Sequence, residues 1–274
     1  MLPEERIAED KADQDIIKEE DVPSPSEKDS GEHSYILKLC GISRGQVNNQ
    51  IGDLLNGDNP KIDISDSHGE IYIRIIAKRT EEKSAKKLAK PVAKEIRSRF
   101  AEKIFAMDEE STLEESVVDL LKNNGLTVTT AESCTGGMIA ARLVDVPGVS
   151  EVFKEGFITY SNKAKRLRLG VKKTTLLAKG AVSEQTVKEM LKGGIKISRA
   201  DVCLAVSGIA GPDGGTEEKP VGTVFIGCFV GGKAYINEHH FDGDRREIRE
   251  KTVTEALALL RLCLLKYYSE KNFS

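Results

Sequence analysis

After residue 106 the chain alternates between short apolar segments and longer segments with the periodicity of amphipathic helices. Strands are expected at residues 126–131, 155–160, 202–206, 221–230 and 234–241, the last two forming a hairpin about Gly231-Gly232. Further helices are expected after Gly137, Ser161 and Ser183, and a long last helix after Asp242 or Asp244. Because such alternation lets helices cover both faces of one sheet, it predicts a three-layer α/β/α domain over residues 107–274.

The first helix of this domain is expected just before the first strand. Ser111 and Glu114 have the spacing of a capping box. An amphipathic pattern follows them to about Asn124, where Gly125 is expected to end the helix.

Residues 33–106 predict a smaller α+β domain, with a net charge of +5. A strand at 35–40 precedes a helix that Ser43 would cap, and two alternating segments around 66–69 predict a hairpin. Val47, Ile51, Leu54 and Leu55 are expected on one face of that first helix. A basic helix carrying Leu88, Val92, Ile96 and Phe100 follows, in which Pro91 predicts a kink or a break.

Residues 1–32 carry 12 acidic and 4 basic side chains and only few large apolar ones. Such a segment cannot bury enough apolar surface to offset the entropy lost on ordering. It is therefore predicted to be a disordered tail or linker.

The composition excludes several classes of protein. The longest apolar stretch, at 256–265, is interrupted by Arg261 and is much shorter than the roughly 20 residues that span a bilayer. The N-terminus lacks the basic and apolar regions of a secretory signal, and the five cysteines are dispersed without a CxxC pair, so a cytoplasmic protein without a disulfide framework is expected. No cluster of histidines or cysteines has the spacing of a metal site.

Four polar clusters follow expected strands, at residues 130–137, 160–165, 207–216 and 242–246. In open α/β sheets, ligands bind at the carboxyl edge of the strands. The first cluster, TAESCTGG, enters a helix, so its amides could bind an anion or an oxyanion, and Ser133 or Cys134 could be a nucleophile. It could equally be a tight turn that needs glycines.

The other clusters are open to similar alternatives. Lys165 falls in the first turn of a helix, where a cation opposes the helix dipole, but it could be a solvated surface lysine. The glycine-rich segment 207–216 lacks the GK[ST] ending of a P-loop and could be a flexible loop. An arginine of 242–246 could bind a phosphate or simply begin a helix.

Taken together, these clusters resemble the CinA/PncC family of nicotinamide-nucleotide amidohydrolases. The resemblance rests on AESCTGG at 131–137, GFITYSNKAK at 156–165, GAVSE at 180–184, SGIAGPDGG at 207–215, EKPVGTV at 218–224 and FDGDR at 241–245. Residues 33–106 resemble, more weakly, the KH-like middle domain of longer CinA proteins. The family's further N-terminal domain has no counterpart in residues 1–32, so pyrophosphatase activity is expected to be absent.

This resemblance implies hydrolysis of nicotinamide mononucleotide to nicotinic acid mononucleotide and ammonia, by a homodimer that uses neither metal nor cofactor. Ser133 would be the nucleophile and Lys165 the general base. Substrate-binding roles are implied for Thr135, Gly136, Tyr160, Ser207, Gly208 and Arg245. Some relatives have threonine in place of Ser207, and Arg246 competes with Arg245 for the phosphate-facing position.

The residue types suit amide hydrolysis. A serine hydroxyl needs an adjacent base, and lysine serves as one only when neutral, so the pKa of Lys165 is expected to be lowered by burial, by its helix position and by the cationic pyridinium of the substrate. We expect the amides after Ser133 to hold the oxyanion and Cys134 to face away with a structural role.

Three other functions remain open from the sequence. The basic residues 33–106 could bind nucleic acid, but Gly41 and Gly45 are one residue too far apart for the GxxG clamp and aromatic residues are few, so nucleic-acid binding is not expected. The same segment could be a structural linker. Lastly, the larger domain could be a nucleotide-binding or competence-associated protein without turnover, although it retains Ser133 and Lys165.

Overall fold

The computed structural model describes residues 31–272, of which side chains are described up to Lys271. The predicted acidic tail lies outside the described residues except for its last two positions. Glu32 is the first residue of a strand, so this strand begins before the boundary at residue 33 that the sequence predicted.

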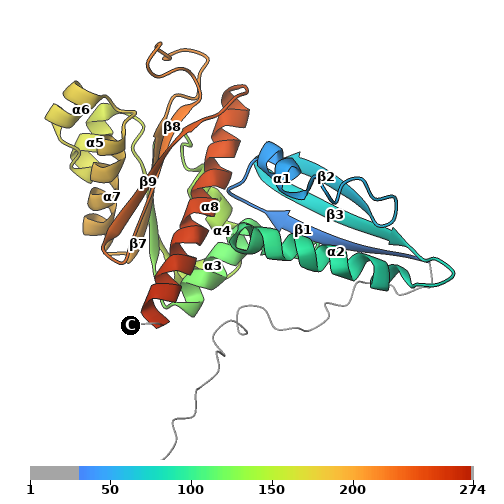
Figure 1. Ribbon diagram of the computed structural model, residues 1–274. Helices are drawn as coiled ribbons and strands as arrows, with labels where there is room; N and C mark the ends of the chain where they lie inside the picture. The colour runs from blue at the N-terminus through green and yellow to red at the C-terminus, as the bar shows by residue number, and fades with distance from the viewer. Residues whose placement is uncertain (1–30, 273–274) are drawn as a thin grey trace, which may run out of the picture. The chain divides into compact units, whose positions relative to one another are not determined.

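The first part of the described chain is built on a four-stranded antiparallel sheet with strand order β2-β3-β1-β4 (Figure 1). Its elements are β1 (Glu32–Leu39), α1 (Arg44–Ile51), β2 (Lys61–Ser67), β3 (Glu70–Lys78), α2 (Ala85–Phe100), a 3-10 turn (Ala101–Lys103) and β4 (Ile104–Ala106). Apolar side chains of β1, β3 and both helices form one core, as the alternation along the strands predicted.

Helix α2 continues without a break through Pro91, so of the kink or break predicted there the break is wrong and the kink stays a prediction. A proline in a helix removes one donor and leaves the carbonyl four residues earlier without its usual partner. Pro91 and Lys87 are both exposed, so water can hydrate that carbonyl. The helix buries a face of small and apolar residues, Ala85, Ala89, Ala93, Ile96 and Phe100, against the sheet.

The second part is built on a five-stranded sheet with order β6-β5-β7-β8-β9. Its strands are β5 (Val128–Glu132), β6 (Phe153–Ile158), β7 (Val202–Gly208), β8 (Thr223–Val230) and β9 (Lys233–His240). Strand β5 is parallel to both β6 and β7, whereas β8 and β9 form the predicted antiparallel hairpin.

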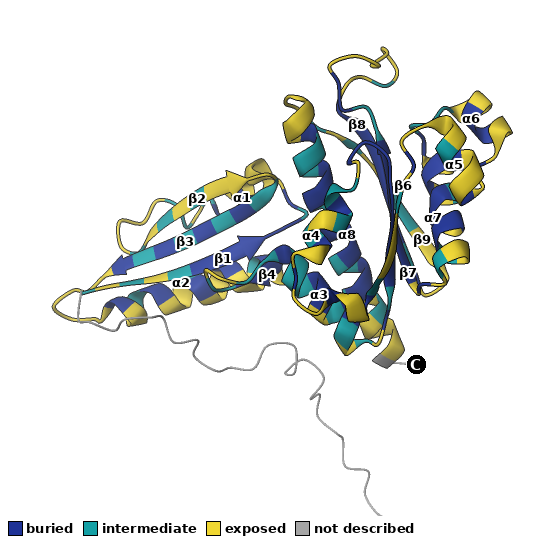
Figure 2. Cartoon of the chain, turned by 180° about the vertical axis from the view of Figure 1, so that it is seen from behind, coloured by how far each residue is buried: buried dark blue, intermediate teal, exposed yellow. Residues whose placement is uncertain are grey.

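Helices cover both faces of this sheet, which confirms the three-layer α/β/α fold. Figure 1 shows α3 (Leu113–Asn123), α4 (Met138–Val144) and α8 (Arg245–Asn272) on one face. The other face carries α5 (Asn162–Leu169), α6 (Lys173–Lys179) and α7 (Glu184–Ser198). Each face has its own apolar core, and the buried residues run along the central strands in Figure 2.

Several element boundaries differ from the predictions. The capping box of α3 is formed by Thr112 and Glu115, one residue later than predicted, because Ser111 instead donates both its amide and its hydroxyl to the carboxylate of Asp108. Helix α1 ends at Ile51, before Leu54 and Leu55. Strand β4 and helix α6 were not expected from the sequence.

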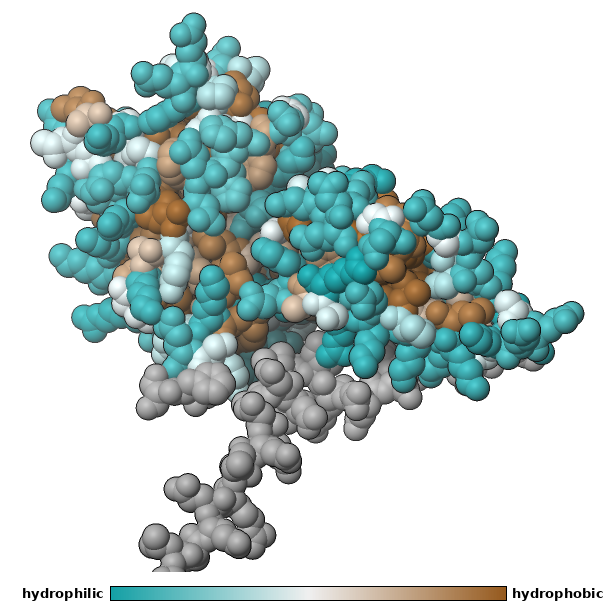
Figure 3. All heavy atoms as spheres, in the orientation of Figure 1, coloured by the Kyte–Doolittle hydropathy of each residue, from teal (hydrophilic) through white to brown (hydrophobic). Residues whose placement is uncertain are grey.

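No helix within residues 31–272 is long and apolar enough to cross a membrane. The face drawn in Figure 3 is mostly hydrophilic, with hydrophobic patches between charged and polar side chains. Among the described residues there is also no group of three or more His, Cys, Asp or Glu side chains that could hold a metal ion.

Candidate active site

The four polar clusters follow β5, β6, β7 and β9, and all four strands run in the same direction. Strands β5, β6 and β7 are parallel, and β9 is antiparallel to β8, which is itself antiparallel to β7. The sheet therefore brings the clusters to one edge, although they are spread over more than 100 positions of the sequence.

Ser133 is the first residue after β5 and is only 7% exposed. Its amide continues the parallel ladder by donating to the carbonyl of Val206 at 3.1 Å. The chain then turns through Gly136 and Gly137, both with positive φ, into α4. Glycine is suited to these two positions because larger residues are strained there.

Lys165 is among the largest fully buried side chains of the described chain, at 1% exposure. It lies on α5, whose first turn is capped by the hydroxyl of Ser161 as the sequence predicted. Its Nζ atom lies 2.7 Å from Ser133 Oγ and donates to the carbonyl of Thr159 at 2.9 Å. The structure thus places an amine and a hydroxyl in direct hydrogen-bond contact.

Burial lowers the pKa of Lys165 from its ordinary value of 10.5 to about 8. An ammonium in low-dielectric surroundings is destabilised relative to the neutral amine. Its two hydrogen-bond partners, a hydroxyl and a carbonyl, are both uncharged. Lys165 is therefore a buried amine and not the solvated surface lysine that the sequence alone left open.

Glu132, the last residue of β5, is a site residue that sequence reasoning missed. Its carboxylate is 1% exposed and accepts hydrogen bonds from the Thr135 hydroxyl and from the amides of Gly137, Ile139 and Ala140. A carboxylate placed just before a helix N-terminus is the available signal, since anions are stabilised there.

Because of this arrangement, most of the amides after Ser133 are already hydrogen-bonded and are not free to bind an anion in the way that the sequence predicts. The amide of Gly136 donates to Ser133 O, and that of Met138 to Thr135 O. Those of Gly137, Ile139 and Ala140 are bound by Glu132. Within the described chain, the amides of Cys134 and Thr135 are those of this turn that donate to no oxygen acceptor; both lie near the Cys134 sulfur.

Thr135 and Gly136 have different surroundings in this turn. Thr135 is buried and its hydroxyl is bonded to Glu132 at 2.6 Å, whereas Gly136 is exposed. Arg249 of α8, which the sequence did not single out, donates to the carbonyls of Cys134 and Thr135. The turn is thus held both by the carboxylate of Glu132 and by Arg249 of α8.

Cys134 points to the opposite face of the sheet from Ser133. It belongs to the core between the sheet and helices α3, α4 and α8. Burial raises the pKa of its thiol to about 11. A thiol that stays protonated and is buried is a poor nucleophile, so the alternative nucleophile loses its support.

Ser207 and Gly208 end β7 beside Ser133. Ser207 follows Val206, which pairs with Glu132, so it is the neighbour of Ser133 on the adjacent strand. Its buried hydroxyl donates to Ala181 O at 2.8 Å and so holds the segment that contains GAVSE. At Gly208 a Cβ atom would lie 2.5 Å from Val224 Cγ2, which explains the glycine by close strand packing.

Arg245 and Tyr160 are in contact although they come from different clusters. The guanidinium of Arg245 donates to the Tyr160 hydroxyl at 3.0 Å and to Gly211 O at 2.6 Å. Arg246 instead pairs with Glu250 along α8, with its side chain 83% exposed. Of the two arginines that the sequence left as alternatives, only Arg245 faces the other clusters.

Comparison with known proteins places the chain in a family. A family model described as the CinA C-terminal domain matches residues 110–264, more than half of the chain. The chain belongs to the CinA family. A second model, described as the KH domain of damage-inducible protein CinA, matches residues 34–106. The described structure is thus a KH-like domain followed by a CinA-type α/β domain.

Individual CinA relatives agree with this assignment. A CinA-like protein of Kosmotoga olearia is 46% identical over 234 residues, which are 85% of this chain and 57% of that protein. A relative from Clostridium novyi is also 46% identical, over 235 residues that make up 56% of its length. The chain therefore spans little more than half the length of these curated relatives.

Solved CinA structures match more than half of the chain. The competence/damage inducible protein CihA from Agrobacterium tumefaciens is 45% identical with a TM-score of 0.54, over 56% of this chain and 93% of that one. A CinA superfamily protein from Escherichia coli is 34% identical with a TM-score of 0.53, over 58% and 95% of the two chains.

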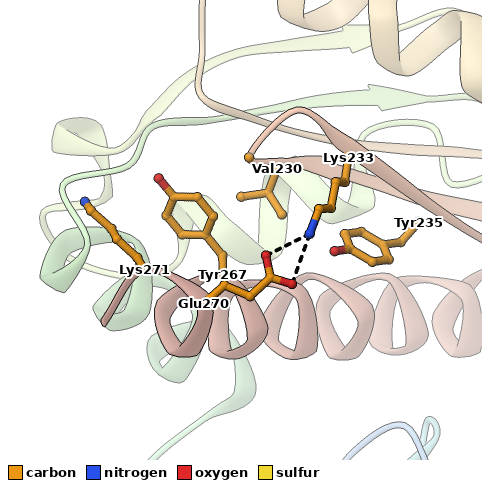
Figure 4. Close-up of a pocket in the computed structure, with 7 residues that line it drawn as sticks. Val230, Lys233, Tyr235, Tyr267, Glu270 and Lys271 are labelled. Atoms are coloured by element: carbon orange, nitrogen blue, oxygen red, sulfur yellow. Dashed lines mark hydrogen bonds and ion pairs between the residues drawn. The ribbon is translucent and has the colours of Figure 1, made fainter. Parts of the chain in front are cut away.

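Two surface hollows in this CinA-family chain contain none of the predicted site residues. One, of about 280 Å³, lies where the β8–β9 turn meets the end of α8 (Figure 4). It is crossed by an ion pair between Lys233 and Glu270 and flanked by Tyr235 and Tyr267. The other, of about 370 Å³, surrounds Arg142.

Proposed function

We propose that this CinA-family chain hydrolyses the carboxamide of nicotinamide mononucleotide, with Ser133 as nucleophile and Lys165 as general base. The observation that carries the proposal is the buried 2.7 Å hydrogen bond between Lys165 Nζ and Ser133 Oγ. A serine hydroxyl becomes an effective nucleophile when a neighbouring base removes its proton. With a pKa of about 8, roughly one tenth of Lys165 is neutral at pH 7.

The reaction proceeds in two halves. Lys165 Nζ accepts the Ser133 proton as Ser133 Oγ bonds to the carboxamide carbon. Lys165 then gives the proton to the amide nitrogen as the C–N bond breaks. Ammonia departs, and the acyl group remains bound to Ser133 as an ester. In the second half Lys165 accepts a proton from water, whose oxygen attacks the ester carbon, and Ser133 recovers its proton as nicotinic acid mononucleotide departs.

The negative charge on the carbonyl oxygen is assigned to the amides of Cys134 and Thr135. Donors directed at a developing oxyanion stabilise the transition state most when water is excluded. Both amides adjoin the nucleophile, and neither donates to an oxygen acceptor within the described chain. The N-terminal amides of α4 are excluded from this role because Glu132 already binds them.

The substrate's charges suit the residues around the pair. Arg245 presents a guanidinium beside the exposed Tyr160, and this group is assigned to the phosphate of the nucleotide. The pyridinium ring is a fixed cation, so its binding near Lys165 disfavours the ammonium form further. Substrate binding therefore increases the neutral fraction of the base.

The test is the release of ammonia from nicotinamide mononucleotide, with and without chelator, by the wild type and by Lys165→Ala. Turnover that survives the chelator and is lost in the variant is the expected result. No turnover by the wild type would overturn the proposal. Calorimetry with the same nucleotide would then distinguish a nucleotide-binding protein without hydrolysis from one that acts on another amide.

A further inference from the structure

We propose that Glu132 is a positioning residue for this hydrolysis, holding the turn that presents Ser133; the inference rests on the proposed function. Its carboxylate receives four hydrogen bonds, all from the turn that follows Ser133 and the first residues of α4. Oε2 accepts from Thr135 Oγ1 at 2.6 Å, Gly137 N at 2.9 Å and Ile139 N at 3.2 Å. Oε1 accepts from Ala140 N at 2.9 Å.

The chemistry of these partners requires an acceptor on both atoms of the group. A carboxylate only accepts, whereas glutamine carries one oxygen and one NH₂ group that only donates. With glutamine at this position, its one oxygen could accept from the three donors that now share Oε2. Its NH₂ group would then face the amide of Ala140, and two donors cannot form a hydrogen bond. The negative charge also suits the N-terminal end of α4, where the helix dipole is positive.

Glu132 is connected to the base through its main chain as well. Its carbonyl accepts from Thr159 N at 2.8 Å, and the carbonyl of Thr159 accepts from Lys165 Nζ at 2.9 Å. The residue thus adjoins Ser133 in sequence and is two hydrogen bonds from Lys165. A displacement of Glu132 can therefore be transmitted to both the nucleophile and the base.

The Glu132 side chain acts from the face opposite to the reaction. Successive residues along a strand point to opposite faces, so the carboxylate lies toward α4 whereas Ser133 points toward Lys165. The carboxylate therefore does not touch the reacting atoms. Its contribution is to fix the orientation of Ser133, and it should change kcat more than KM.

The experiment compares Glu132→Ala and Glu132→Gln with wild type. Glu115→Ala is the matched control, because Glu115 also accepts an amide at a helix start, that of Thr112, but on α3. The measurements are kcat and KM for nicotinamide mononucleotide, the Tm, and the rate at which a sulfonyl fluoride labels Ser133. Labelling reports on the nucleophile independently of the nucleotide.

We expect Glu132→Ala to lower kcat about 100-fold with KM nearly unchanged, since a displacement of about 1 Å costs that much. Glu132→Gln should lose less, and labelling should slow in the same order. Glu115→Ala should lower only the Tm. If Glu132→Ala folds and has the kcat and the labelling rate of the wild type, the positioning role is overturned, whereas the proposed hydrolysis is unaffected.

The remaining outcomes separate this inference from the function on which it rests. If the wild type releases no ammonia but Ser133 is labelled, and labelled more slowly in the Glu132 variants, the hydrolysis proposal fails and the positioning role stands. If the wild type is not labelled either, both fail. If neither Glu132 variant folds while Glu115→Ala does, Glu132 serves folding and the inference is overturned.

Discussion

The side chains of Lys165 and Ser133 meet at 2.7 Å although they lie 32 positions apart, on α5 and at the end of β5. Parallel pairing of β5 with β6 makes the meeting possible, because both strands end at the same edge of the sheet. The chain then turns from β6 into α5, which carries Lys165 back over Ser133. Several consequences of this buried pair can be measured.

The first prediction concerns the pH dependence of turnover. The base must be neutral, and burial lowers the pKa of Lys165 to about 8. We therefore expect kcat/KM to rise with pH through a midpoint near 8 and then to level off. Lys165→Arg, which stays charged, should be inactive at every pH. A profile that is flat between pH 6 and 9 would contradict the assignment of Lys165 as base.

A second prediction concerns stability, because a buried lysine opposes folding while it is charged. In the unfolded chain Lys165 titrates near 10.5, so between about pH 8 and 10.5 the unfolded state binds more protons and stability rises with pH. Below pH 8 the full penalty applies. The shift from 10.5 to about 8 corresponds to roughly 3 kcal/mol at 1.36 kcal/mol per unit.

Lys165→Met should accordingly unfold at higher denaturant concentration than wild type at pH 7. Its advantage should shrink toward pH 10.5, where the wild-type penalty is lost. Urea titrations of both proteins at pH 7 and pH 10 check this. An advantage that is the same at both pH values would show that desolvation of the ammonium is not its cause.

The third prediction separates the two adjacent candidate nucleophiles. Ser133→Ala should abolish ammonia release without loss of the fold, because it removes the attacking oxygen. Cys134→Ala should keep most turnover, since the Cys134 thiol lies in the core on the opposite face. Its cost should appear as a lower Tm, from the cavity left behind. The reverse pattern of activities would reassign the nucleophile to Cys134.

A fourth prediction distinguishes the two neighbouring arginines. Arg245→Gln should raise KM for the mononucleotide by about 10- to 100-fold, the loss expected for hydrogen bonds to a charged group. Arg246→Gln should leave KM unchanged, because that side chain pairs with Glu250 in solvent. Initial-rate kinetics check both variants, and equal effects on KM would rule out a specific role for Arg245.

The fifth prediction concerns Arg142 of α4, which pairs with Glu70 of β3 at 2.8 Å and with Glu114 of α3. Both carboxylates are largely buried, so removal of the arginine leaves two negative charges without a counterion. Arg142→Ala should lower the free energy of unfolding by about 3 kcal/mol, and Arg142→Ala with Glu70→Gln should recover part of it. Additive losses in the double mutant would contradict direct coupling.

The elements that the sequence predicted well are those whose signals are local. Ser161 and Ser183 cap helices as expected, and Gly170 ends α5 in the left-handed region. The β8–β9 hairpin turns at Gly231-Gly232. In each case a few neighbouring residues determine the backbone conformation, so no distant contact is needed.

The errors occur where a distant or competing contact decides. Helix α2 continues through Pro91 because sheet packing of its alanine face outweighs one missing hydrogen bond. The capping box of α3 begins at Thr112 and not at Ser111, because Ser111 is hydrogen-bonded to Asp108. Strand β4 has only three residues and depends on pairing with β1, which periodicity does not reveal.

The sequence by itself determined the fold class, the order of most strands and helices, and the motifs that carry Ser133 and Lys165. Only the tertiary structure decided that Lys165 is buried against Ser133, that Arg245 and not Arg246 meets Tyr160, and that Glu132 binds the start of α4. Periodicity and capping depend on neighbours within a few residues. Burial, and the pKa that follows from it, depends on atoms brought together by strand pairing across the whole domain.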